Sequence, residues 1–126
     1  MPVKRVHICL ALVLVLDSTG TALADNAESL LVRSRAAAHV GNWESASRLV
    51  QAAIVADPKR VSSYVALADL YLHSGHPDFA NFYYAEALQL DPQNKEAQAG
   101  LAVSDREAKD QTAAADRSLD KKNNDH

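Results

Sequence analysis

The stretch of residues 61–94 reads VSSYVALADLYLHSGHPDFANFYYAEALQLDPQN and contains the clearest structural signals of the chain. Its first part carries apolar residues at helical spacing, and Gly75 follows where the end of a helix needs a left-handed residue. Pro77 opens a second amphipathic segment, because proline is tolerated in the first turn of a helix. Asp91-Pro92 closes it, because proline cannot continue a helix. The stretch therefore predicts a helical hairpin that turns at Gly75.

The preceding stretch repeats this pattern at a period of 34 residues. Sliding residues 27–60 onto residues 61–94 aligns Gly41 with Gly75, Ala46 with Ala80, Ala53 with Ala87, Ile54 with Leu88, and Asp57-Pro58 with Asp91-Pro92. Each unit therefore predicts the same pair of helices, and units that cannot bury an apolar face alone do so by stacking on their neighbours.

This repeat resembles the tetratricopeptide repeat family. The second unit carries the family pattern in Tyr64, Leu67, Ala68, Tyr71, Gly75, Ala80, Tyr84, Ala87 and Pro92. The first unit carries it in Leu30, Arg33, Ser34, Ala37, Gly41, Ala46, Val50, Ala53 and Pro58. Arg33 and Ser34 replace the usual large and small apolar pair there, which weakens the first helix of that unit. The resemblance implies an all-α, right-handed α-solenoid of two helix pairs.

A third unit begins at residue 95 and is incomplete. Leu101 and Ala102 match the pattern, but Gln98 and Asp105 are polar where large residues are expected. We therefore expect residues 95–109 to form a capping helix with a polar outer face, which closes a repeat domain of residues 25–109. Residues 110–126 are rich in Asp, Lys, Asn and Ser, which predicts a polar disordered tail.

The N-terminus has the layout of a secretory signal peptide over residues 1–24. Lys4-Arg5 precedes an apolar run over residues 6–16, Asp17 to Gly20 interrupts it, and Ala22-Leu23-Ala24 is a cleavage signature. The apolar run is too short to cross a hydrocarbon core of about 30 Å. The sequence thus predicts an exported protein, periplasmic or secreted, without a stable membrane anchor after signal removal. The single cysteine, in the apolar run, would leave with the signal.

Composition and motifs argue against several classes of function. Aromatic residues make up only 6% of the chain, which favours closely packed helices over a β-sandwich. The formal net charge of −3 without a basic block argues against nucleic-acid binding. The sequence contains no glycine-rich phosphate loop, no G-x-S-x-G elbow and no H-E-x-x-H helix. We therefore expect neither an enzyme nor a bound cofactor or metal.

The resemblance implies that the first helix of each unit lines a concave surface that binds another protein. The predicted partner-binding residues are Leu31, Arg35, His39, Val65, Asp69, Leu72, His73 and Arg106. Further positions on the same faces are Glu28, Ala38, Ser62, Glu96, Ala99 and Val103. These residues mix apolar and charged groups. They lack the lysine and asparagine pattern by which some family members clamp the C-terminal carboxylate of a chaperone.

Several ring-bearing residues allow other interpretations. His39 and His73 share one repeat position and His76 is near His73, so a histidine-based metal carrier is an alternative function. These histidines also suit helix C-termini, where imidazolium interacts favourably with the helix dipole. Trp43 is expected to pack between the two helices of its unit. Phe82 and Tyr83 lie off the repeat pattern and are candidates for a second contact surface.

The favoured function is an exported adaptor or assembly scaffold that holds a peptide or helix of another envelope or secreted protein. In exported bacterial proteins, the resemblance implies roles in assembling pili, secretion machinery, envelope polymers or respiratory complexes. The alternative is a structural repeat subunit that assembles with copies of itself, because repeat folds need about three units to bury a continuous core. The face around Leu31, Val32 and Val40 would then form the contact between subunits.

Overall fold

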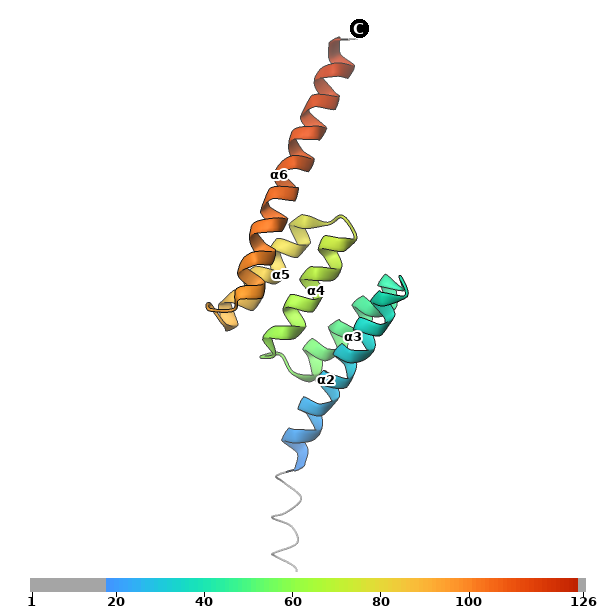
Figure 1. The fold of residues 1–126 in the computed structure, drawn as a ribbon, viewed down its shortest axis with the longest axis vertical. Helices are drawn as coiled ribbons and strands as arrows, with labels where there is room; N and C mark the ends of the chain where they lie inside the picture. Colours follow the sequence, from blue (N-terminus) through green and yellow to red (C-terminus); the bar gives the residue numbers. More distant parts are fainter. Residues whose placement is uncertain (1–17, 125–126) are drawn as a thin grey trace, which may run out of the picture.

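The chain folds into a stack of helices over residues 18–124, which are the residues that the computed structural model describes. The helices are α2 (Ser18–His39), α3 (Trp43–Ala56), α4 (Val61–His73), α5 (Pro77–Leu90) and α6 (Lys95–Asn124) (Figure 1). No strand occurs between residues 18 and 124. The prediction of an all-α fold is confirmed.

The predicted signal peptide lies mainly outside the described residues. Residues 18–24 are described and form the start of α2. Helix α2 runs through Gly20 and continues to His39. A single glycine inside a helix costs only about 1 kcal/mol relative to alanine, so it does not end the helix by itself.

Two glycines with left-handed backbone turn the chain within each repeat. Gly41 has φ +76° and Gly75 has φ +78°, values that L side chains rarely adopt. In each turn the N–H of the residue after the glycine donates to the carbonyl five residues earlier, over 2.9 Å. These bonds satisfy carbonyl groups at the helix end, as the repeat pattern predicts. The Asn42 side chain then accepts a bond from the Ser45 N–H and caps α3.

Each helix packs against the next one along the chain, which gives a tetratricopeptide-like solenoid. Several alanines are fully buried between these helices, and their small side chains let helix backbones approach. The first core cluster contains Ala27, Leu31, Ala46, Val50, Ala53, Leu67 and Leu70. The second contains Val65, Ala68, Ala80, Tyr84, Ala87 and Ala97.

Ser34 has a structural role in the first repeat. It is buried, and its hydroxyl donates to the carbonyl oxygen of Ala46 over 2.9 Å. This bond joins α2 to α3 directly. The serine is therefore satisfied inside the core, where a buried hydroxyl without a partner would be costly. Arg33, beside it, is exposed.

The polar residues of the third unit bind the repeat before them. The Gln98 amide donates to the carbonyl of Pro92 over 2.8 Å, just as the Tyr64 hydroxyl donates to the carbonyl of Pro58 over 2.8 Å. Asp105 accepts a bond of 2.8 Å from the side-chain amide of Asn81 on α5. The polar replacements in this unit thus dock α6 through hydrogen bonds.

The last helix is longer than the sequence predicts. α6 continues past residue 109 to Asn124, so residues 110–124 are helical and the expected disordered tail is wrong for this part of the chain. Alanine, glutamine and lysine are good helix formers, and the sequence has no proline after Pro92 to end the helix. Figure 1 shows the last turns of α6 running beyond the other helices, and their residues are almost all exposed.

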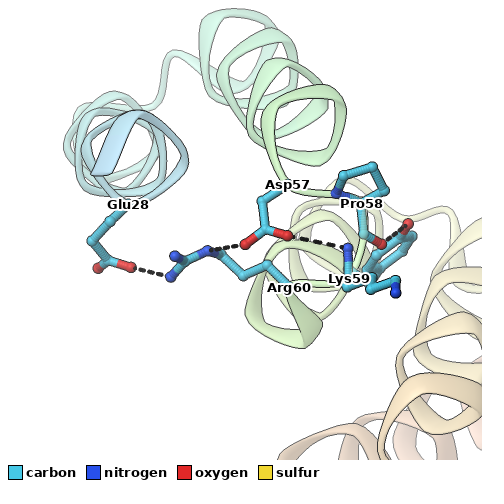
Figure 2. A network of polar contacts seen from close by, with 6 residues as sticks. Glu28, Asp57, Pro58, Lys59 and Arg60 are labelled. Atoms are coloured by element: carbon cyan, nitrogen blue, oxygen red, sulfur yellow. Dashed lines mark hydrogen bonds and ion pairs between the residues drawn. The ribbon is translucent and has the colours of Figure 1, made fainter. Parts of the chain in front are cut away.

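A network of ion pairs connects α2 to Arg60, the residue directly before α4 (Figure 2). The Arg60 guanidinium lies between two carboxylates, 2.9 Å from Glu28 of α2 and 3.3 Å from Asp57. The other carboxylate oxygen of Asp57 accepts the N–H of Lys59, so the aspartate also shapes the turn. The network holds α2 against the turn that leads into α4.

Candidate functional site

A pocket of about 280 Å³ opens between the first helices of the repeats, and we call it the groove. Helices α2 and α4 supply most of its walls, and the first turn of α6 and the first residue of α3 complete it. Its volume is at the lower end of small-molecule sites, which run from about 300 to 1,000 Å³. Its lining residues are Ser34, Arg35, Ala38, Trp43, Ser62, Val65, Ala66, Asp69, Leu70, His73 and Glu96.

The groove follows α4 for most of that helix. Ser62 marks one end and His73 the other, which corresponds to about 17 Å at a rise of 1.5 Å per residue. Between them, Val65, Ala66 and Leu70 supply an apolar surface. An extended peptide rises about 3.3 Å per residue, so the groove can contact about five residues of a bound segment.

Trp43 lies at the rim of the groove, and the expectation that it packs between the helices of its repeat is wrong. Its side chain is 42% exposed and stacks on the ring of His73, with centroids 6.1 Å apart. Trp43 is the first residue of α3, directly after the turn, which brings it to the C-terminal end of α4. The ring of His73 is fixed in turn by a 2.8 Å contact between its Nδ1 and the carbonyl oxygen of Asp69.

Asp69 presents a carboxylate that a buried tyrosine holds in place. The Tyr84 hydroxyl donates a hydrogen bond to Oδ1 of Asp69. Burial is the main cause of the raised pKa of the Tyr84 phenol, and the hydrogen bond to Asp69 raises the pKa further. The phenol therefore stays protonated and remains a donor to Asp69.

The groove contains more free negative charge than positive charge. Arg35 lies 4.0 Å from the carboxylate of Glu28. Within residues 18–124, neither Asp69 nor Glu96 has a cation within ion-pairing distance. The two unpaired carboxylates therefore give the α4 and α6 side of the groove an acidic character.

The predicted partner-binding residues divide into two groups. Arg35, Val65, Asp69 and His73 line the groove, as do Ala38, Ser62 and Glu96 from the wider set. Leu31 does not, because it is 0% exposed in the first core cluster, and its prediction as a groove residue is wrong. Its neighbour on the next turn, Ser34, faces the groove instead. His39, Leu72 and Arg106 lie outside the groove lining.

The main groove residue that sequence reasoning missed is Trp43. The family pattern assigns no role to this position, and the second repeat has Pro77 there. A large aromatic residue at a position that the fold does not require is the signal that could have identified it. Leu70 and Ala66 were missed for a different reason, since both contact the core and the groove together.

The histidines do not form a metal site in the structure described. His73 stacks on Trp43, whereas His76 makes an edge contact with Phe79, and His39 is exposed. Among residues 18–124, no group of three or more His, Cys, Asp or Glu side chains is placed to hold a metal ion. The geometry thus offers no support for the alternative of a histidine-based metal carrier.

A second aromatic group lies on α5. Tyr71 of α4 stacks on Tyr83 at 5.4 Å and contacts Phe79 at 5.3 Å, and Phe82 meets Tyr83 edge-on at 5.1 Å. Phe82 is 57% exposed, whereas Tyr83 is half-buried. Burial raises the pKa of Tyr83, and Tyr71 adds to this effect. Phe82 is thus exposed as its position off the repeat pattern suggests.

Comparison with known families identifies the second repeat. Residues 61–94 match the sequence model of the family described as Tetratricopeptide repeat. No curated protein matches the chain. Within residues 18–124, no helix combines the length and apolar character needed to cross a membrane. The family match covers the complete second helix pair, α4 and α5.

Proposed function

We propose that this protein is an adaptor or assembly scaffold that binds a peptide segment or helix of another protein in the groove. The observation that carries the proposal is the exposed ring of Trp43 at the rim of a pocket that also contains unpaired charged groups. Tryptophan is enriched among the residues that dominate binding energies at protein interfaces. Tetratricopeptide repeats also generally mediate protein–protein interactions, which agrees with the family match.

The shape of the groove favours a chain segment over a compact ligand. Its walls come from several helices and its length follows α4, so side chains of an elongated segment can be contacted in succession. The apolar surface at Val65 and Ala66 lies between polar groups at both ends. Such an arrangement provides anchoring by apolar contact and orientation by charge.

The groove chemistry favours binding over catalysis. Tyr84 is the phenol that touches the groove carboxylate, and its pKa is raised, so it is a poor base or nucleophile near neutral pH. Tetratricopeptide repeats are typically non-catalytic interaction modules. We therefore propose that the protein is not an enzyme and acts through its partner.

Export to the cell envelope is part of the proposal and rests on the N-terminal sequence. A signal peptide of residues 1–24 would be removed after Ala24, leaving a chain that begins at Asp25 in the helical region of α2. N-terminal sequencing of the protein purified from its native host tests this directly. A protein that retains Met1 or Pro2 contradicts export by cleavage at this site.

The test of the adaptor function is a crosslinking pull-down with the full chain, tagged at its C-terminus, in its native host. The groove variant carries Arg35→Ala and Trp43→Ala. The control carries Arg48→Ala and Val55→Ala, which change an exposed cation and an apolar side chain on α3 that is 82% exposed, both outside the groove. A partner captured by the native chain and the control but lost with the groove variant supports the proposal. A partner captured equally by all three contradicts a role for the groove.

Self-assembly is a second candidate, because α2 and the turn directly after it expose apolar side chains. Val32 is 55% exposed and Val40 is 77% exposed. In this reading the same pull-down captures only copies of the chain, and the groove variant behaves like the control. Light scattering coupled to size-exclusion chromatography then shows a mass that rises with concentration, whereas a constant monomer mass contradicts self-assembly.

A further inference from the structure

We propose that the segment bound in the groove carries a basic side chain, lysine or arginine, that pairs with Asp69 and Glu96 while a neighbouring apolar side chain packs on Trp43. This inference rests on the proposed function and specifies the chemistry of the partner. It follows from which charged groups of the groove are already paired and which are available.

Asp69 is held in position but is not neutralised. Its Oδ1 accepts the Tyr84 hydroxyl, and Tyr84 is itself fully buried in the second core cluster. Tyr84 cannot move toward α6 either, since its ring lies against the backbone of Gly100 so closely that a Cβ there would collide with it. A neutral donor orients the carboxylate without removing its charge, so Asp69 can still pair with an incoming cation.

Glu96 brings a second carboxylate to the same side of the groove. It stands in the first turn of α6 and lines the pocket together with Asp69. The charges of Asp69 and Glu96 both contribute to the raised pKa of the Tyr84 phenol, which agrees with their place in one pocket. Two carboxylates facing one pocket repel each other and attract a positive group, especially where side chains partly exclude water.

The cations of the groove do not offset this charge. Arg35 lies on the opposite wall, on α2, and faces Glu28 at 4.0 Å. His73 contacts the carbonyl oxygen of Asp69 through Nδ1 and stacks on Trp43, so its ring is committed to the rim. A bound basic group would therefore supply the positive charge that the α4 and α6 wall lacks.

Trp43 provides the second half of the recognition. An exposed indole ring attracts cations through its face and also packs on aliphatic side chains. Lysine and arginine combine an aliphatic stem with a charged head, so either can cover the apolar surface at Val65 while the head reaches the carboxylates. An acidic segment would instead place like charges beside Asp69 and Glu96.

The experiment selects peptides with the immobilised full chain from a displayed library of random dodecapeptides. We expect lysine and arginine to be enriched, and aspartate and glutamate depleted, relative to the input library. The variant Asp69→Asn/Glu96→Gln should lose this bias, because both carboxylates are neutralised while the hydrogen bond from Tyr84 can still form. The control Asp110→Asn/Asp120→Asn makes the same change in net charge on an exposed part of α6 and should keep the bias.

A second measurement works on the native chain alone and does not depend on the folding of a variant. A selected peptide is synthesised with capped ends, and its basic residue is replaced by glutamine. We expect affinity to fall about fivefold at low salt, as is typical of losing one partly exposed ion pair, and less at high salt. The fluorescence of Trp43, the single tryptophan, reports binding.

The outcomes separate this inference from the proposed function. Selected peptides without charge bias, or enriched in acidic residues, overturn the basic preference but leave peptide binding in the groove intact. Failure to select any peptide also overturns it, and the pull-down with Arg35→Ala and Trp43→Ala then decides independently whether the groove binds a partner.

Discussion

Two equivalent contacts, each between the second helix of a repeat and the helix that follows it, are made by different residues. In the first repeat, Val50 is buried and Ala66 packs against its cluster. At the corresponding positions, 34 residues later, the second repeat has the larger Tyr84 and the next helix has Gly100. A glycine in the middle of a helix costs about 1 kcal/mol relative to alanine, so Gly100 is explained by the space that the tyrosine ring takes.

Tyr84 also connects the core of the second repeat to the groove. Tyr84 reaches Asp69, whereas Val50 cannot bond to Arg35, the residue that corresponds to Asp69. In the first repeat, the ion pairs of Arg60 instead hold α2 against the start of α4 (Figure 2). The contact of Tyr84 with Gly100 is therefore made by close packing, and the contact of α2 with the start of α4 by partly exposed charges. The two should respond very differently to mutation.

The largest effect is expected for Gly100→Ala, which should destabilise the protein by about 2 kcal/mol. Overpacking a filled site costs about 1–3 kcal/mol, and the better helix propensity of alanine offsets only part of this destabilisation. Tyr84 is fully buried and cannot move away from the added methyl group. Chemical denaturation followed by circular dichroism measures the loss.

The control for this prediction places the residue types of the first repeat, those of Val50 and Ala66, at positions 84 and 100. In a Tyr84→Val background, Gly100→Ala should stabilise the protein by up to about 1 kcal/mol, because the collision is gone and the helix propensity remains. A reversal of sign between the two backgrounds identifies the contact. If Gly100→Ala has the same effect in both, the tyrosine does not account for the glycine.

A smaller effect is expected for Tyr84→Phe, which keeps the ring and removes the hydrogen bond to Asp69. The loss should be about 1 kcal/mol at neutral pH, a usual net value for a hydrogen bond. The variant also changes the dependence of stability on pH. The native fold raises the pKa of Tyr84 above the unfolded value of 10.0. As pH rises past that value, the unfolded chain loses the phenol proton before the folded chain does, so stability falls.

Without the Tyr84 phenol, the free energy of unfolding should decline less steeply above pH 10. Tyr83, whose pKa is also raised, should account for the decline that remains. Denaturation curves between pH 8 and about 11 make the comparison, since free tyrosine titrates near 10. Tyr64→Phe removes a partly exposed hydroxyl that bonds to the Pro58 carbonyl and is the matched control. Equal slopes for native protein and Tyr84→Phe would show that Tyr84 titrates normally in the fold.

The helix pairs could be predicted from the sequence because their signals are local. Gly75, Pro77 and Pro92 each impose a backbone conformation whatever surrounds them, and the helices begin and end close to these residues. The end of α6 could not be predicted in the same way. The polar composition of residues 110–126 predicts disorder, but helix propensity and the absence of proline extend the helix to Asn124.

The groove was predictable only in part, because contacts between repeats decide it. Repeat position points to Arg35, Asp69 and His73, which line the groove. It failed for Leu31, which points into the core, and for Trp43, whose location depends on how α3 meets α4. The hydrogen bond from Tyr84 to Asp69 could not be predicted from the sequence either, because Tyr84 is a position of the family pattern and Asp69 a predicted groove position.

The smallest effect is expected for Glu28→Gln, which breaks the partly exposed ion pair between α2 and the residue before α4. The pair of Glu28 with Arg60 is 2.9 Å long but partly solvated, and exposed ion pairs contribute about 0.2–1 kcal/mol. We expect a loss of about 0.5 kcal/mol at low ionic strength that fades toward zero near 1 M salt, where screening acts within about 3 Å. Thermal unfolding across a salt series measures it, with Glu44→Gln as control, because Glu44 pairs with Arg48 on its own helix. A loss above about 2 kcal/mol, or one that salt does not reduce, would mean that charge holds α2 against the start of α4 as strongly as packing does, since exposed pairs do not reach that value.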